Sequence, residues 1–192
     1  AADHFTERGF TQAAFFSTET QRTQQLRAEG FSQRFFEKTG NRPASLVWAL
    51  QPGTKIDDWQ SLGRWLKREL RALPKPVAIF CHCDYDAAKV ETACLEAGYP
   101  IPEDVAILGV DNDALVCENV RIPISSVRHD RSKIGYEGSA LLDRLMRGGK
   151  PPAAPLLIPP RGVELRASTD NFATADPLIR AVVKFFRENI GR

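Results

Sequence analysis

Short apolar runs alternate with longer amphipathic runs through the first 112 residues of the chain. The apolar runs are continuous rather than alternating, which is typical of strands covered by helices on both faces. They predict strands at Thr11–Phe16, Leu46–Leu50, Val77–Cys81 and Val105–Val110. The amphipathic runs repeat with a helical period and predict helices at Thr20–Lys38, Asp58–Leu73 and Asp86–Ala97.

Repeated strand–helix–strand units favour parallel pairing through right-handed crossovers. The fold class predicted here is therefore α/β, an open and mainly parallel sheet with helices on both faces. Ligands of such sheets bind beyond the carboxyl ends of the strands, so the residues that follow each strand are where a site is expected.

The regular alternation of strand and helix patterns ends after Asn112. A short strand or connector is expected at Ile122–Val127, and a helix at Ser132–Arg147 that two glycines and two prolines end. Two brief apolar runs, Leu156–Ile158 and Gly162–Leu165, follow it. Residues 168–175 are polar and predict a linker, after which Asp176 and Pro177 start another helix.

Composition and charge narrow the function classes. Of 192 residues, 43% are hydrophobic and 26% charged, which is ordinary for a globular protein. The net charge is +2, so the chain lacks the surplus of basic residues expected of a protein that binds DNA by itself. No apolar run approaches the roughly 20 residues that cross a bilayer. No signal peptide is visible, and four irregularly spaced cysteines suit a reducing cytosol, so a cytoplasmic protein is expected.

Sequence motifs give catalysis little support. Glycine-rich nucleotide loops, the nucleophile elbow and the zinc-protease motif are all missing. The cluster Cys81-His82-Cys83-Asp84 offers metal-ligand types, but strand alternation separates His82 from the cysteines and no second ligand pair follows. No metal or cofactor is therefore expected. His4 and His129 have no carboxylate, serine or cysteine at suggestive spacing and are interpreted as surface or connector residues.

Two carboxylates follow predicted strands, Asp84 after Val77–Cys81 and Asp111 directly after Val105–Val110. Both should border one crevice, where carboxylates accept pairs of hydroxyl hydrogen bonds, as sugar or polyol recognition requires. Alternatives stay open at this stage. Asp84 or Asp86 could instead cap the following helix, and Asp111 could instead order a turn.

Two arginines lie on the first long helix. Arg27 precedes Phe31 by one helical turn and so faces much as a core residue does, where its guanidinium could offer a bidentate fork to ligand hydroxyls. A solvated ion pair is the competing interpretation for Arg27. For Arg22 the solvated interpretation is preferred.

Several segments together resemble a known family. Val105–Asp113, Pro123–Val127 and Ile134–Leu142 are similar to the sugar-sensing domain of the lactose/purine-repressor superfamily, whose fold is that of type I periplasmic binding proteins. Leu157–Asp170 and Asp176–Ile179 resemble the xylose-operon activator group, in which the sensor precedes an AraC-type pair of helix-turn-helix units.

The resemblance implies an incomplete chain. Residues 1–167 would be an effector-sensing domain, mostly its second lobe, with the first lobe's sequence missing and the second lobe itself incomplete. Residues 168–175 would be a linker, and 176–192 the first helix of a truncated helix-turn-helix DNA-binding domain. The Ser132–Arg147 helix would pack on the missing lobe, so a partner chain or further residues should cover Leu141 and Leu145.

The resemblance also implies ligand-binding residues. Arg27 matches the family's sugar-contacting arginine, and Asp111 matches the aspartate that binds sugar hydroxyls. Cys83 and Asp84 stand where many relatives have Asn-Asp or Thr-Asp at the cleft. A cysteine lacks an amide's paired donor and acceptor, which argues against a plain pentose as the ligand.

The expected function is that of a cytoplasmic, homodimeric, sugar-responsive transcriptional regulator. A neutral monosaccharide or polyol between two lobes would shift it between DNA-binding states, with DNA contacted through the C-terminal domain and not by this chain. One alternative is a solute-binding protein of a sugar transport system, which the missing signal peptide disfavours. Another is a small α/β enzyme using Asp84 or Asp111 as a general base, which the missing nucleophile and cofactor motifs disfavour.

Overall fold

One mainly parallel sheet organises the molecule. The computed structural model describes residues 1–51, 58–170, 173 and 176–189. Within those residues a six-stranded sheet has the order β2-β1-β3-β4-β5-β6. Its strands are β1 (Ala13–Ser17), β2 (Ala44–Val47), β3 (Val77–Cys81), β4 (Val105–Val110), β5 (Ser125–Val127) and β6 (Val163–Glu164). Neighbouring strands are parallel except for β5 and β6, which confirms the predicted fold class.

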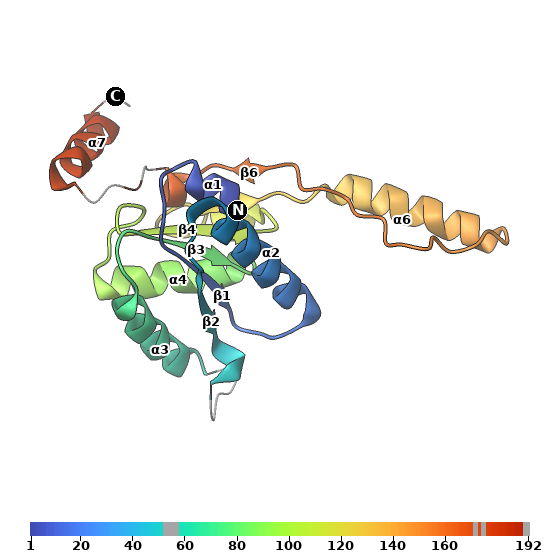
Figure 1. Cartoon of the computed structure of the whole chain (residues 1–192), viewed down its shortest axis with the longest axis horizontal. Helices are drawn as coiled ribbons and strands as arrows, with labels where there is room; N and C mark the ends of the chain where they lie inside the picture. The colour runs from blue at the N-terminus through green and yellow to red at the C-terminus, as the bar shows by residue number, and fades with distance from the viewer. Residues whose placement is uncertain (52–57, 171–172, 174–175, 190–192) are drawn as a thin grey trace.

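Helices cover both faces of this sheet (Figure 1). The α-helices are α1 (Ala2–Thr6), α2 (Arg22–Thr39), α3 (Trp59–Ala72), α4 (Asp84–Ala97), α5 (Ala114–Cys117), α6 (Arg131–Met146) and α7 (Pro177–Asn189). Two short 3-10 helices, η1 (Trp48–Leu50) and η2 (Ala167–Thr169), complete the described elements. None of the helices in these ranges is both long and apolar enough to cross a membrane.

Two hydrophobic clusters, one on each face, form the core. On one face Phe15 and Phe80 of the strands pack with Phe31 of α2, and their rings lie 5.0–5.8 Å apart. On the other face Phe16 packs toward Trp65 of α3. Every residue of β1, β3 and β4 is buried, so each strand supplies both clusters by alternation. Each large apolar side chain buried in this way stabilises the fold by about 1.5–3 kcal/mol.

One predicted strand is wrong in its second half. The apolar run Leu46–Leu50 was expected to be strand throughout, but β2 ends at Val47 and the chain turns into η1. The parallel pairing of β2 with β1 stops at the Ser17–Val47 pair. Trp48 then turns inward and packs against Trp65 with ring centroids 5.5 Å apart, so burial of a large side chain outweighs strand continuation.

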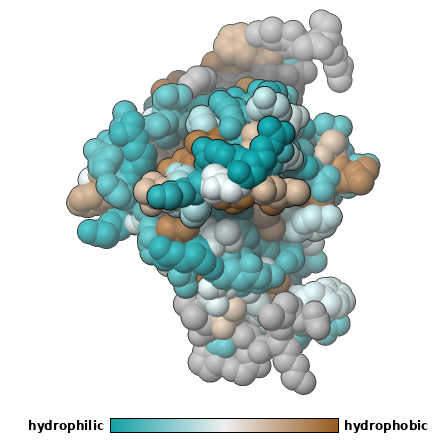
Figure 2. All heavy atoms as spheres, turned by 90° about the vertical axis from the view of Figure 1, so that its right-hand side faces the viewer, coloured by the Kyte–Doolittle hydropathy of each residue, from teal (hydrophilic) through white to brown (hydrophobic). Residues whose placement is uncertain are grey.

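α6 leaves the body of the molecule as a projecting arm (Figure 1). Residues 147–161 return beside it, and among the described residues α6 has no buried side chain. Exposed apolar side chains lie along it, including Ile134, Leu142 and Met146. Figure 2, viewed from the side toward which the arm projects, shows brown apolar residues among teal polar ones. Of the two residues expected to need a cover, Leu145 is exposed, whereas Leu141 is half-buried and lines a pocket with Pro155 and Leu156 of the returning segment.

The C-terminal connection begins later than predicted. Ser168 and Thr169 are fully buried and belong to the body, since the Ser168 hydroxyl donates to the Ile107 carbonyl over 2.6 Å. The linker therefore does not start at residue 168, and residues 171–172 and 174–175 of it lie outside the described residues. The helix expected from Asp176 is present as α7, and residues 190–192 of that prediction lie outside the described residues.

Candidate functional site

Two of the predicted site residues meet at the carboxyl ends of the strands. Arg27 comes from the first turns of α2, and Asp111 directly follows β4. Arg27 Nη2 lies 3.8 Å from Asp111 Oδ1, with 26% and 37% of the respective side chains exposed. A donor fork and a carboxylate thus lie side by side where ligands of parallel sheets bind. Arg22, five residues earlier on α2, is exposed, as predicted.

Two histidines complete this cluster, and the sequence interpretation missed both. Arg27 Nη1 donates to the His82 carbonyl and lies 3.2 Å from His82 Nδ1. Arg27 Nη2 lies 3.2 Å from His129 Nε2, which is itself 3.1 Å from Asp111 Oδ1. The interpretation of His129 as a residue without a carboxylate partner is therefore wrong. The strand-end rule could have found it, because His129 follows β5 by two residues.

The backbone at Asp111 is held in an uncommon conformation. Asp111 has φ of 106° and Asn112 has φ of 52°, both in the left-handed region that favours glycine. The Asp111 N–H donates to the Val127 carbonyl over 3.0 Å, and the Asn112 N–H donates to Ser126 Oγ over 3.0 Å. Non-glycine residues in this region cost about 1–3 kcal/mol and concentrate at functional sites. The strain indicates that the position of the Asp111 carboxylate is selected rather than incidental.

Asp84 lies beneath this turn rather than in the open cluster. It is 1% exposed, and its carboxylate accepts from the Ser126 hydroxyl over 2.5 Å and from the Asp113 N–H over 2.7 Å. Burial raises the pKa of Asp84, and these two hydrogen bonds partly offset that rise. Gly109 permits the close approach, because a Cβ there would stand 2.2 Å from Asp84 Oδ1. Asp84 therefore fixes the turn that carries Asp111.

The helix-capping alternative for these carboxylates does not hold. Cys83, with no capping hydrogen bond from its side chain, is the N-cap of α4, and Asp84 is the first helical residue. Asp86 accepts instead from the backbone and hydroxyl of Thr18, over 3.0 and 2.9 Å, and pairs with Lys89 at 3.0 Å. Asp86 thereby connects α4 to the residue that follows β1.

The cysteines next to the cluster are neutral thiols. Cys83 is half-buried, and burial followed by the nearby Asp86 raises its pKa. Cys81 is fully buried, and burial raises its pKa well above the ordinary thiol value. Across the described residues, no three His, Cys, Asp or Glu side chains are grouped so as to hold a metal ion. The strand-end chemistry is thus hydrogen bonding by a guanidinium, a carboxylate and imidazoles.

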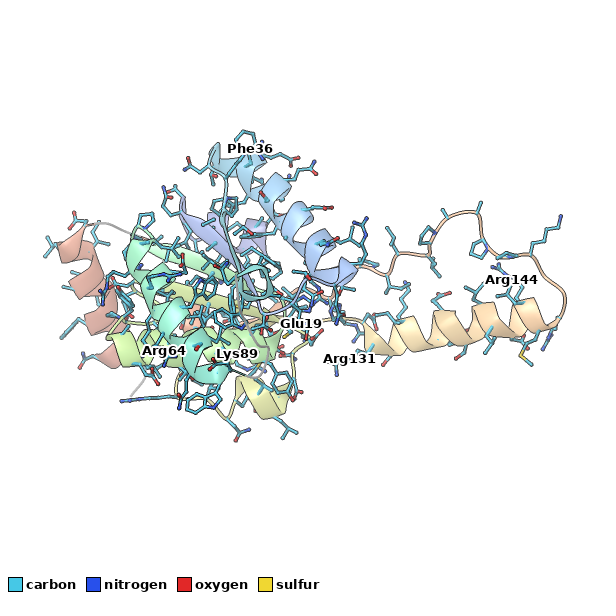
Figure 3. All side chains as sticks on the ribbon, turned by 90° about the horizontal axis from the view of Figure 1, so that it is seen from below. Glu19, Phe36, Arg64, Lys89, Arg131 and Arg144 are labelled. Atoms are coloured by element: carbon cyan, nitrogen blue, oxygen red, sulfur yellow. The ribbon has the colours of Figure 1, made fainter. Side chains whose placement is uncertain are left out.

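Further polar residues surround the cluster. Arg131, at the base of α6, donates to the Asp111 carbonyl over 2.9 Å, and Arg166 donates to Asn112 Oδ1 over 2.9 Å. Glu19, just after β1, lies close enough to influence the pKa of His82. Figure 3 shows Glu19 and Arg131 at the edge of the body from which the arm leaves. Sequence spacing gives no signal for Arg166, because 54 residues separate it from Asn112.

A separate groove lies between α3 and α4. It has a volume of about 420 Å³ and is lined by residues that include Trp59, Arg64, Lys67 and Lys89. None of the cluster residues lines it. The cluster at the strand ends concentrates the hydrogen-bonding chemistry and the backbone strain, so it is the stronger candidate for a ligand site.

Comparison with known families agrees with this geometry. A family model described as "Periplasmic binding protein-like domain" matches residues 2–169. This chain belongs to that family. The matched region includes the sheet, the strand-end cluster and the arm, and it ends at Thr169, the last residue of η2.

Three relatives illustrate the similarity. The Xylose operon regulatory protein of Haemophilus influenzae is 30% identical over 191 residues, which cover 97% of this chain and 48% of that protein. A solved structure of the xylose-binding transcription activator xylR has a TM-score of 0.78 and 28% identity, covering 96% of this chain and 48% of its own. A dimeric Lac repressor shares the fold at TM-score 0.69 and 18% identity, covering 90% of this chain and 59% of its own. The chain thus spans about half the length of the first two relatives.

Proposed function

We propose that this chain is mostly one lobe, the second, of the two-lobed effector-sensing domain of a sugar-responsive transcriptional regulator. The observation that supports it most is the juxtaposition of Arg27, on α2, with Asp111, on a strained turn, at the strand ends of a periplasmic-binding-protein-like fold. The regulator names of the relatives that match over most of this chain support the same function.

The chemistry of the cluster favours a neutral sugar or polyol. A guanidinium donates several hydrogen bonds in one plane and a carboxylate accepts several, and a pair of vicinal hydroxyls satisfies both. Arg27 and Asp111 are proposed to contact these hydroxyls, with the half-buried Cys83 lining the cleft. Asp84 is proposed to act from below by holding the Asp113 N–H and the Ser126 hydroxyl.

A second wall of the cleft is proposed to come from polypeptide outside this sequence. The side chains of Arg27, His129 and Asp111 remain 26%, 31% and 37% exposed, whereas small-ligand sites bury most of the ligand surface. The exposed apolar residues of α6, including Leu142 and Leu145, are proposed to form the surface on which that second wall packs. An effector bridging the two walls would favour the closed arrangement by its differential affinity for it.

The remaining parts of the proposal concern the whole regulator. α7 is proposed to be the first helix of a helix-turn-helix DNA-binding domain, so that this chain by itself does not bind DNA specifically. The regulator is proposed to be a cytoplasmic homodimer whose DNA-binding state the effector shifts.

The test is sugar binding by the full-length protein that contains these residues. D-xylose, other pentoses, hexoses and polyols are screened by thermal shift, and hits are titrated by calorimetry. Loss of a charged hydrogen bond costs about 1.5–3 kcal/mol, so Arg27→Ala should weaken the best sugar about 10- to 150-fold. The matched variant Arg22→Ala, on the same helix but exposed, should bind like the wild type.

Two results would contradict the proposal. No sugar of the panel binding to the wild type would remove the effector function. Affinity unchanged within two-fold in Arg27→Ala would move the site elsewhere. Steady conversion of the bound sugar into a product would instead favour the enzyme alternative with Asp111 as a general base.

A further inference from the structure

Arg166 is an arginine of the C-terminal connection whose side chain reaches back to the strand-end turn. It lies two residues after β6 and one residue before η2, and its side chain is 13% exposed. Its Nη1 donates to Asn112 Oδ1 over 2.9 Å and to the Ile124 carbonyl over 3.1 Å. Its Nη2 pairs with Glu118 Oε1 at 3.1 Å. Three segments that are distant from Arg166 in sequence thus meet on one guanidinium.

The bond to Asn112 links this arginine to the candidate ligand site. Asn112 follows Asp111 directly, and both have positive φ, 52° for Asn112 and 106° for Asp111. Such conformations are costly for residues other than glycine and need support from the surrounding structure. Ser126 Oγ holds the Asn112 N–H over 3.0 Å, and Arg166 holds the Asn112 side chain. Arg166 therefore supports the turn that places the Asp111 carboxylate 3.8 Å from Arg27.

The ion pair with Glu118 does not account for the placement of Arg166. The Glu118 side chain is 58% exposed, and solvent screening leaves such a pair little net effect on stability. The two bonds from Nη1 are partly buried, and losing a partner costs more there. A lysine carries its donors on one nitrogen and lacks the planar fork that spans these partners. The contact with Asn112, rather than the ion pair, is therefore the one expected to matter for binding.

The backbone of Arg166 anchors the same segment to the sheet. The Arg166 N–H donates to Ser125 Oγ over 2.8 Å, and the Ser125 hydroxyl donates back to the Arg166 carbonyl over 2.9 Å. The buried Thr169 hydroxyl donates to Ser125 Oγ over 2.7 Å. η2 ends at Thr169, and α7 begins at Pro177. The segment that leads to α7 is thus fixed to β5, the neighbour of the strand that carries the turn.

We propose that Arg166 is a positioning residue of the effector site that couples sugar binding at Asp111 to residues 163–170, the segment that leads to α7. This inference rests on the proposed function. A sugar bound at the cluster selects the turn conformation that the Arg166–Asn112 bond supports. By linkage, the bond strengthens sugar binding by the same factor by which the sugar strengthens the bond. Residues 163–170 are thereby held more firmly when the site is occupied.

Sugar affinity of the full-length protein tests the positioning role, with D-xylose as the first probe and calorimetry as the measurement. Asn112→Gly removes the acceptor for Arg166 but keeps a residue that tolerates positive φ. It should weaken binding at least about five-fold, the lower end of typical coupling factors. Asn112→Asp keeps a side-chain oxygen at the same reach and should bind within about two-fold of the wild type. The control Glu164→Gln weakens an exposed ion pair of the same segment, with Arg128, and should also bind within about two-fold.

A double variant separates this contact from a general loosening of the turn. If Arg166 acts through Asn112, Arg166→Gln should weaken binding in the wild-type background and cause little further loss in Asn112→Gly. Losses that multiply would show that the two residues act independently and would overturn the role of Arg166. Circular dichroism verifies that each variant is folded. If Arg166→Gln does not fold, the Asn112 variants decide, and equal losses in Asn112→Gly and Asn112→Asp would overturn the role.

Hydrogen exchange of residues 163–170 gives a readout that a purely structural role would not change. Saturating sugar should slow exchange of this segment in the wild type by about the factor that Asn112→Gly loses in affinity. In Asn112→Gly the same sugar should change the exchange rate by less than about two-fold, whereas Glu164→Gln should keep the wild-type ratio. A contact that only stabilises the fold would alter exchange equally with and without sugar.

The outcomes separate this inference from the proposed function. Binding by Asn112→Gly within about two-fold of the wild type overturns the role of Arg166 and leaves the sugar site standing. A bound sugar that does not slow exchange of residues 163–170 in the wild type also overturns it. No binding of any panel sugar to the wild type overturns the proposed function and this inference with it.

Discussion

The body around the sheet and the α6 arm differ in how far they bury their side chains. In the body, β1, β3 and β4 bury every residue, and the strand-end turn is fixed by a buried carboxylate. In the arm, α6 runs for 16 residues without a buried side chain. An isolated helix of about this length is only marginally stable in water, so the arm depends on whatever covers its apolar face.

The candidate ligand site lies in the body, whereas the exposed apolar surface lies on the arm. The body is complete enough to hold Arg27, His129 and Asp111 in place without help from outside. The arm exposes an apolar face, which the proposed second lobe would cover. Substitutions should therefore act strongly in the body and weakly in the arm, unless the covering polypeptide is present.

The largest difference is expected for large-to-small substitutions. Phe35→Ala in α2 removes a fully buried ring and should lower the free energy of unfolding by about 3–5 kcal/mol. Leu142→Ala in α6, where the side chain is 59% exposed, should change it by less than about 0.5 kcal/mol. Urea denaturation of this chain measures both. A loss above about 2 kcal/mol for Leu142→Ala would show that the arm is already packed.

A histidine in the body gives a pH-dependent contribution. Burial, followed by Arg8 and the N-terminal amine, lowers the pKa of His4 to about 4 from the ordinary 6.5. Between these values the unfolded chain binds a proton that the folded chain does not, so stability falls as pH drops from about 6.5 to about 4. Because His4 is only partly buried, the loss should be about 2 kcal/mol. Urea melts across this window should show it, and His4→Gln should remove it.

Replacing a glycine by alanine should change the free energy of unfolding in opposite directions in the two regions. Gly109→Ala places a Cβ 2.2 Å from Asp84 Oδ1 and 3.2 Å from Asp84 Cα, and should cost about 1–3 kcal/mol. Gly138→Ala in α6 meets nothing within 4 Å and should stabilise the helix by up to about 1 kcal/mol. Thermal melts of the two variants test this. A neutral Gly109→Ala would mean that Asp84 does not hold the turn.

The smallest effect in this chain should become large in the full-length protein. Leu142→Ala should remain near neutral here but cost about 2–4 kcal/mol where a second lobe covers α6. Parallel urea melts of the two chain lengths make the comparison. An equal, small cost in both would contradict the proposal that α6 seats the second wall.

Sequence patterns predicted the elements that burial and periodicity control. The strands Val77–Cys81 and Val105–Val110 were predicted with the bounds that the structure gives them. Both are continuous apolar runs, and such runs are typical of strands that helices cover on both faces. The turn at Trp48 was not foreseen, because the inward rotation of Trp48 depends on Trp65, 17 positions later. Local periodicity carries no information about such a contact.

The site was predicted only in part. The strand-end rule pointed to Asp111, the helical spacing to Phe31 pointed to Arg27, and the resemblance pointed to both; the structure brings them to 3.8 Å. His129 was missed because its partner Asp111 lies 18 positions earlier on another strand end, and the rule was applied to carboxylates alone. The buried position of Asp84 depends on Ser126 and Gly109, which meet it only once the sheet is formed.

The most direct test of the account is a crystal structure of the full-length protein with the sugar that stabilises it most. We expect ring hydroxyls within hydrogen-bond distance of both Arg27 and Asp111, with a second lobe seated on α6. A sugar bound elsewhere, for example in the groove between α3 and α4, with Arg27 and Asp111 free of it, would contradict the proposed site.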